Sequence, residues 1–195
     1  MKERSMTDDN QLYFEYLKTR SRLGSMYRRH WLYPRISKRL RGRALDIGCG
    51  IGDMLAHRPD TLGVDINPHT VEYCRSLGLP ASQMAVDHVP YADQDFDSVL
   101  LDNVLEHIAD PNTILGEVHR VLRPGGRLVV GVPGRKGWGS DSDHKVFYDE
   151  STLRATIEVK GFTWDETFFT PMWESEWLGR VIRSYCVYGV FRRRE

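Results

Sequence analysis

Three glycines at alternating positions are the residues of this chain that point most directly to chemistry. The segment 44–52 reads Ala-Leu-Asp-Ile-Gly-Cys-Gly-Ile-Gly, an apolar run with one carboxylate, Asp46, that leads into Gly48, Gly50 and Gly52. An apolar run of this kind is typical of a buried parallel strand. The glycines let the backbone turn and approach a ligand with no Cβ in between. A helix that begins near Gly52 would direct its free N–H groups at that ligand.

A second carboxylate follows the next apolar run. Asp65 ends the run 61–65, and Ile66 comes directly after it. In nucleoside-binding α/β folds a carboxylate at this place accepts hydrogen bonds from ribose hydroxyls. The glycine spacing differs from the Gly-x-Gly-x-x-Gly pattern of dinucleotide sites. The two features together predict a nucleoside cofactor, whereas a tight turn without a ligand would leave both Asp46 and Asp65 without a reason.

Two histidines are the candidate catalytic groups. His107 follows the expected strand 98–102, and His144 follows a loop, 134–143, that leaves the expected strand 127–132. Loops at the carboxyl ends of parallel strands line the active crevice, and a histidine titrates near neutral pH, as a general base requires. The alternatives are a cofactor-lining or structural role for His107 and a cap or local packing for His144. No carboxylate cluster or cysteine spacing in the sequence indicates a metal site.

The elements that must position these residues alternate between strands and helices. This alternation predicts an α/β fold with a doubly wound, mostly parallel, Rossmann-like sheet. The last apolar runs, 162–170 and 185–191, have no clear crossover helix between them and predict antiparallel closing strands. We expect the other strands at 43–47, 61–65, 83–86, 98–102 and 127–132, and helices at 51–57, 68–77 (with Asn67 as N-cap), 111–121 and 150–159.

The first part of the chain differs from the rest in charge. We expect one domain over 1–195, in which residues 1–42 form a helical extension ahead of a cofactor-binding core at 43–195. Residues 1–43 carry 12 lysines and arginines against 4 acidic residues, whereas residues 44–150 carry 8 against 17. A basic extension on an acidic body favours an anionic acceptor. The alternative is a solvated helix face.

Composition excludes several classes of protein. No segment approaches the ~20 apolar residues of a membrane span, and no apolar run follows the charges of residues 1–5, so no secretory signal is expected. Three widely separated cysteines, Cys49, Cys74 and Cys186, suit a reducing compartment. We therefore expect a cytoplasmic protein. The basic residues belong to no recognised nucleic-acid-binding module, and the oligomeric state stays open.

The wider pattern resembles the class I S-adenosylmethionine-dependent methyltransferases, close to the small-molecule branch that includes the quinone-biosynthesis enzymes. The resemblance covers residues 40–162, and it is the order of many blocks that makes it specific. The matching blocks are 45–52, 64–67, Asp87, Pro90, 96–97, 101–108, 110–111, Glu117, 120–126, His144, Leu153 and 161–162.

The resemblance implies an enzyme that transfers the methyl group of S-adenosylmethionine to oxygen or carbon of a small-molecule acceptor and releases S-adenosylhomocysteine. It implies no metal. The loop spacing and the closing strands speak against a nicotinamide-dependent oxidoreductase, and a non-catalytic cofactor-binding module is the other alternative. The implied cofactor contacts are the glycine loop with Asp46, Gly48 and Gly50; Asp65 at the ribose; Ile66, Asp87 and His88 near the adenine; and Asn103 at the methionine end.

Overall fold

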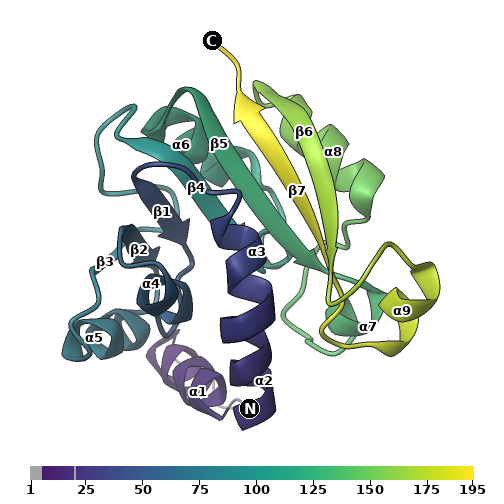
Figure 1. The fold of residues 1–195 in the computed structure, drawn as a ribbon. Coiled ribbons are helices and arrows are strands. Elements are labelled where there is room, and N and C mark those ends of the chain that lie inside the picture. The colour runs from purple at the N-terminus through teal and green to yellow at the C-terminus, as the bar shows by residue number, and fades with distance from the viewer. Residues whose placement is uncertain (1–5, 20) are drawn as a thin grey trace.

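The computed structural model describes residues 6–19 and 21–195, whose centre is a seven-stranded sheet in the order β3-β2-β1-β4-β5-β7-β6 (Figure 1). Strands β1 to β5 pair in parallel, and β7 pairs antiparallel with both β5 and β6. The predicted doubly wound sheet with antiparallel closure is therefore confirmed. The strands are β1 (Ala44–Ile47), β2 (Thr61–Asp65), β3 (Ala81–Gln83), β4 (Phe96–Asp102), β5 (Leu122–Pro133), β6 (Phe162–Thr170) and β7 (Cys186–Arg193).

Helices cover both faces of this sheet and gather at one of its ends. They are α1 (Met6–Lys18), α2 (Arg22–Tyr27), α3 (Tyr33–Ser37), α4 (Asp53–His57), α5 (Pro68–Ser76), α6 (Asn112–Val121), α7 (Arg135–Trp138), α8 (Glu150–Glu158) and α9 (Glu176–Val181). A π-helical turn, Arg28–Leu32, joins α2 to α3, and a 3-10 turn, Leu105–His107, follows β4.

The central strands are mostly apolar and are buried on both faces. Successive side chains of a strand point to opposite sides, so Val99 and Leu101 of β4 belong to the core under α6 and α8. Leu100 between them belongs to the core on the other face, where it joins Ile36 of α3. Each large apolar side chain buried in this way contributes roughly 1.5–3 kcal/mol. The resulting rigid sheet fixes where its strand ends lie.

The N-terminal extension is helical over α1, α2 and α3, although residues 1–5 and 20 lie outside the described part. The sequence predicts one helix at 26–40 that Pro34 interrupts. Proline lacks an N–H, and its ring clashes with the carbonyl four residues earlier. The chain meets this constraint with the wider turn Arg28–Leu32 and continues as α3 with Pro34 in its first turn. The side chains of Tyr33 and Ile36 are then buried against the sheet.

Two predicted strands have clearly wrong boundaries. The third strand lies at Ala81–Gln83 rather than 83–86, because its partner is Gly63–Asp65 and the pairing ends where β2 ends. The fifth strand begins at Leu122 rather than at 127. Leu122 already pairs with Phe96, and the ladder then shifts register before it resumes. Neither change moves the carboxyl ends of the strands that carry the candidate site.

The strand order reverses between β1 and β4, and this reversal is the topological switch point where α/β sheets bind ligands. The carboxyl end of β1 leads into Gly48, and that of β4 leads into Asn103. In Figure 1 the helices α1 and α2 lie on one side of this end of the sheet, and α7 and α9 lie on the other. The fold thus brings the N-terminal extension to the edge that the sequence marks as functional.

Candidate functional site

The glycine loop after β1 has the backbone conformation that its sequence predicts. Gly48, Gly50 and Gly52 all have positive φ, at 76°, 53° and 79°. A Cβ added at Gly48 would lie 2.5 Å from Val104 Cγ2, so this position needs glycine for space as well as for conformation. A Cβ at Gly50 would meet only Leu17 Cδ1 of α1, at 3.4 Å. The loop therefore presents its backbone toward α1.

Asp65 ties this loop to the end of β2. Its two carboxylate oxygens accept hydrogen bonds from the backbone N–H groups of Gly50 and Asn67, each at 2.8 Å. The side chain is buried, and burial raises its pKa, while the backbone hydrogen bonds act in the opposite direction. An ionised carboxylate offers about four lone-pair positions. Asp65 can therefore still accept hydroxyl donors from a ligand.

Two further carboxylates lie at the same end of the sheet. Burial raises the pKa of Asp46 well above its ordinary value, and the nearby charges of Asp102 and Asp65 raise it further. Asp102 accepts a hydrogen bond from the Tyr188 hydroxyl at 2.7 Å and lies 3.7 Å from the Arg28 guanidinium. Neighbouring negative charges disfavour the ionised form of Asp46. The arrangement consequently favours a ligand that carries positive charge.

Asn103 is held in a left-handed conformation directly after β4. Its φ is 57°, which is uncommon for a residue with a side chain. Its backbone N–H donates to the Gly131 carbonyl at 2.9 Å, and its side-chain amide donates to Asp102 at 2.9 Å. Both bonds fix the amide at the switch point, as expected for a residue that positions a ligand.

A cavity of about 440 Å³ opens beside Asn103. It lies between the N-terminal helices and the segments that follow β4 and β5. Both predicted histidines line it. Its polar or titratable lining includes Tyr13, Tyr16, Arg28, Asn103, Glu106, His107, Asp141, His144 and Arg183. The lining of the cavity does not include Asp65, so the cavity is distinct from the predicted ribose site.

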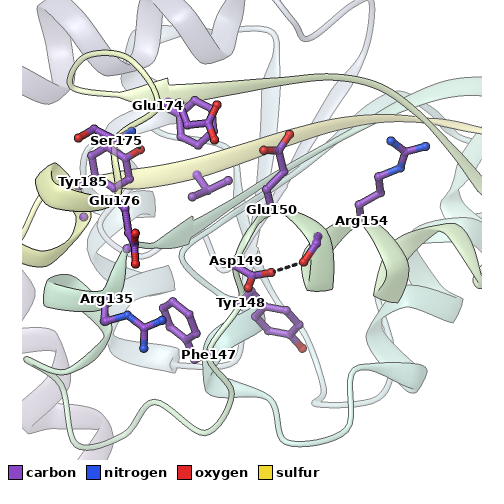
Figure 2. A pocket seen from close by; sticks show the side chains of 15 residues that line it. Arg135, Phe147, Tyr148, Asp149, Glu150, Arg154, Glu174, Ser175, Glu176 and Tyr185 are labelled. Carbon is purple, nitrogen blue, oxygen red and sulfur yellow. Dashed lines mark hydrogen bonds between the residues drawn. The ribbon is translucent and has the colours of Figure 1, made fainter.

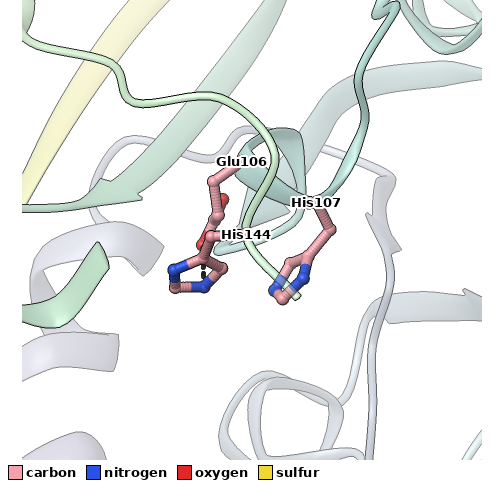
Figure 3. A group of neighbouring side chains, drawn as sticks. All are labelled: Glu106, His107 and His144. Atoms are coloured by element: carbon pink, nitrogen blue, oxygen red, sulfur yellow. Dashed lines mark ion pairs between the residues drawn. The ribbon is translucent and has the colours of Figure 1, made fainter. Parts of the chain in front are cut away.

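Glu106, His107 and His144 form a cluster of neighbouring side chains, as Figure 3 shows, and all three line this cavity. The two imidazole rings meet edge to face with their centroids 4.6 Å apart. His144 Nε2 lies 3.9 Å from Glu106 Oε1, and the side chains of both residues are less than a tenth exposed. Burial and then the neighbouring His144 lower the pKa of His107. The two histidines that the sequence singles out separately therefore lie in one place.

Each histidine is oriented by an oxygen on its other ring nitrogen. His144 Nδ1 lies 2.8 Å from the Trp138 carbonyl, so this nitrogen carries the proton and Nε2 presents a lone pair. His107 Nδ1 lies 3.4 Å from Asp143 Oδ2. The loop after β5 thus supplies His144 itself as well as a partner for His107.

Sequence reasoning missed Glu106 as a functional residue. Its side chain is 1% exposed, and burial raises its pKa to about 8. Neither carboxylate oxygen has a hydrogen-bond partner among the described residues. Its backbone carbonyl accepts hydrogen bonds from the N–H groups of Lys145 and Val146, which hold the loop that carries His144. A glutamate beside His107 in a turn is the one local signal that could have indicated it.

The predicted adenine contacts lie apart from this cluster. Ile66 is about half exposed beside Asp65, and Asp87 and His88 are exposed. His88 Nδ1 lies 3.1 Å from Glu117 Oε2, an oxygen that also accepts the Val89 N–H at 2.7 Å. None of the three predicted residues lines the cavity beside Asn103. Their contact with adenine stays a prediction.

A second cavity, of about 530 Å³, lies among α7, α8, α9 and the end of β6 (Figure 2). Arg135, Phe147 and Glu174 are among its lining residues, and none of the sequence-predicted site residues is. Asp149, which also lines it, caps α8 by accepting the Thr152 N–H at 2.9 Å. Because this cavity holds none of the sequence-predicted site residues, the cavity beside Asn103 remains the candidate site.

No helix in the described ranges is long and apolar enough to cross a membrane.

Comparison with known proteins finds that this chain is similar to methyltransferases. Residues 45–130 match the family model described as a methyltransferase domain. The chain is 31% identical over 157 residues to the "Probable S-adenosylmethionine-dependent methyltransferase" of Mycolicibacterium smegmatis, which covers 72% of this chain and 60% of that relative. It is 35% identical over 101 residues to the ubiquinone biosynthesis O-methyltransferase of Xanthomonas oryzae, covering 45% of this chain and 41% of the relative.

A solved structure shares the fold along nearly its whole length. The S-adenosylmethionine-dependent methyltransferase from Archaeoglobus fulgidus superimposes with a TM-score of 0.72 at 20% identity, covering 94% of this chain and 99% of the other. By contrast, this chain spans only 30–60% of the length of the first four curated relatives it matches.

Proposed function

Because this chain carries a methyltransferase domain over residues 45–130, as its resemblance to the class I enzymes predicted, we propose that it methylates a small molecule with S-adenosylmethionine. The observation that carries the proposal is the meeting of three features at the switch point. These are the glycine loop, the Asp65 carboxylate that binds it, and the cavity beside Asn103. A nucleoside cofactor at the first two would direct its reactive end toward the third.

The residues present fit this cofactor. S-adenosylmethionine carries an ammonium group and a sulfonium group, and the sulfonium makes its methyl carbon electrophilic. The buried carboxyl of Asp46, close to the charges of Asp65 and Asp102, suits such a cation. Asp65 has acceptor positions left for ribose hydroxyls. Ile66, Asp87 and His88 are the proposed neighbours of the adenine.

The cavity suits an acceptor of modest size. Its volume of about 440 Å³ falls in the range of small-molecule sites. Asn103, His107 and His144 are polar groups that would face the acceptor there. We assign activation of the acceptor to His144 and His107. Alignment of nucleophile, carbon and sulfur can by itself supply several kcal/mol of barrier lowering.

The N-terminal extension is proposed to cover the site. Leu17 of α1 is buried and faces Gly50, and the amide of Asn67 donates to the Asn10 carbonyl at 2.8 Å. The excess of basic residues in this extension favours an anionic acceptor. The three free cysteines support a reducing, cytoplasmic location.

The test is a turnover assay with a panel of hydroxylated aromatic acids and sugars. The purified chain and S-adenosylmethionine are incubated with each candidate, and mass spectrometry follows both the gain of one methyl group and the release of S-adenosylhomocysteine. His144→Ala should lower kcat by about 10²–10⁴, the usual loss for a group that assists proton removal. Cofactor affinity should stay nearly unchanged. A variant with wild-type kcat would remove His144 from the reaction.

A further inference from the structure

The proposed methyl transfer does not explain why Glu106, His107 and His144 lie together in the acceptor cavity. We infer that Glu106, His107 and His144 bind a divalent transition-metal ion of the zinc class in the acceptor cavity. The site stands on geometry that is independent of the reaction. What the ion does for the acceptor rests on the proposed function.

The spacing of the three side chains is close to that of a metal site. One ligand atom from each lies within 4.8 Å of one from each of the others, and His144 Nε2 is 3.9 Å from Glu106 Oε1. With Zn–N and Zn–O bonds of about 2.0–2.2 Å, the ligand atoms of a tetrahedral site are about 3.4 Å apart. The 3.9 Å pair would have to close by about half an ångström, and a pair at the 4.8 Å limit by about 1.4 Å.

The partners of the two imidazoles are those of metal-binding histidines. A metal-bound histidine usually donates its second N–H to a backbone carbonyl or a carboxylate, which fixes the ring and directs the other nitrogen at the ion. His144 has the Trp138 carbonyl on Nδ1 at 2.8 Å, and His107 has the Asp143 carboxylate on Nδ1 at 3.4 Å. Each ring is thus left with Nε2 as its free ligand atom.

The environment of Glu106 supports a cation site independently of the histidines. Its side chain is 1% exposed, and both carboxylate oxygens lack a hydrogen-bond partner among residues 6–19 and 21–195. A buried and unpaired carboxylate is costly. The 3.9 Å separation from His144 is too long for a hydrogen bond that would satisfy it. A cation between the carboxylate and the imidazoles removes this cost.

Two histidines and one carboxylate leave at least one coordination position open, as in catalytic zinc sites. All three side chains line the cavity, so a hydroxyl oxygen of an acceptor held there could occupy this position. A bound cation lowers the pKa of such a hydroxyl, and the proton leaves to solvent. His144 and His107 then activate the acceptor as ligands of the ion and not as bases. The oxygen then forms a bond to the methyl carbon as the carbon–sulfur bond breaks, and that electron pair stays on sulfur. The inferred substrate class is therefore an acidic hydroxyl, such as a phenol or enol, methylated at oxygen.

The first test measures metal binding directly on the full chain without a histidine tag. The protein is dialysed against a chelator and titrated with Co²⁺, whose visible absorption reports coordination, and elemental analysis counts Zn²⁺ after reconstitution. We expect one ion per chain. Glu106→Gln should abolish the absorption, whereas His119→Gln, a control at a half-buried histidine of α6 outside the cavity, should retain it. Asp143→Asn should weaken binding by about 10–100-fold, the usual effect of losing an orienting partner.

Calorimetry with S-adenosylmethionine on the same variants separates this inference from the proposed function. Intact cofactor binding together with loss of the ion in Glu106→Gln supports the metal site. Cofactor binding with no stoichiometric Co²⁺, or with Co²⁺ binding that survives Glu106→Gln in a folded variant, overturns it and leaves the methyltransferase proposal in place. Methyl transfer that is unaffected by the chelator would likewise overturn a role for the ion.

Discussion

Replacement of Asp65 is the most informative perturbation of the expected cofactor site. The carboxylate is proposed to accept hydrogen bonds from both ribose hydroxyls while it holds Gly50 and Asn67. Hydrogen bonds to a charged group contribute about 1.5–3 kcal/mol. Asp65→Ala should therefore weaken the binding of S-adenosylmethionine by roughly 10- to 100-fold.

The same substitution has a structural cost that must be kept apart from the binding effect. It leaves the N–H groups of Gly50 and Asn67 without their acceptor, and each unsatisfied buried donor costs about 1–3 kcal/mol. The sum is a large share of a typical stability of about 5–15 kcal/mol. Asp65→Asn keeps the size of the side chain and one acceptor oxygen. It should remain folded and still lose roughly tenfold in affinity, because the charge is gone.

The assay is calorimetric titration of each variant with S-adenosylmethionine, next to a thermal melt. Asp60→Asn, an exposed carboxyl in the turn before β2, is the matched control and should leave both the affinity and the melt unchanged. If Asp65→Asn is folded and binds as tightly as the wild type, the carboxylate does not contact the ribose and the reasoning fails.

Two further predictions concern the scaffold. A Cβ at Gly131 would lie 2.2 Å from Tyr188 Cε1, so Gly131→Ala should destabilise the fold by about 1–3 kcal/mol. Nothing lies within 4 Å of a Cβ at Gly116 in α6, so Gly116→Ala should stabilise the fold by about 0.5–1 kcal/mol. Denaturant unfolding measures both changes, and equal effects of the two substitutions would contradict this reasoning. Hydrogen bonds from Arg120 lower the pKa of Glu117 to about 2, so the stability it contributes is complete above its ordinary pKa of about 4.3 and is lost as the pH falls toward 2. Unfolding free energies should therefore show that Glu117→Gln costs about 1–3 kcal/mol at pH 7 and much less near pH 2, and a constant difference would refute the assignment.

Features that depend on local chemistry could be predicted from the sequence. The continuous apolar run of β4 indicates a strand buried on both faces, and the three glycines indicate a loop with positive φ. The N-cap at Asn67 is another such case. Its side chain accepts the His69 N–H at 3.0 Å, as an asparagine before Pro68 indicates.

Features that depend on contacts between distant segments could not be predicted in this way. His107 and His144 are 37 positions apart, and nothing in their spacing places their rings 4.6 Å from each other. The contact arises because the loop after β5 folds back onto the Glu106 carbonyl. For the same reason the sequence indicates no metal site, although the folded chain brings two imidazoles and a carboxylate together. The weak helical pattern of α1 likewise gives no sign that Leu17 lies over Gly50.

The central claim is that the glycine loop and Asp65 hold S-adenosylmethionine. Calorimetric titration of the wild-type chain with S-adenosylmethionine, S-adenosylhomocysteine and NAD in separate runs tests it most directly. We predict saturable binding of one S-adenosylmethionine per chain, competition by S-adenosylhomocysteine and no heat from NAD. Binding of NAD without binding of S-adenosylmethionine would contradict the account.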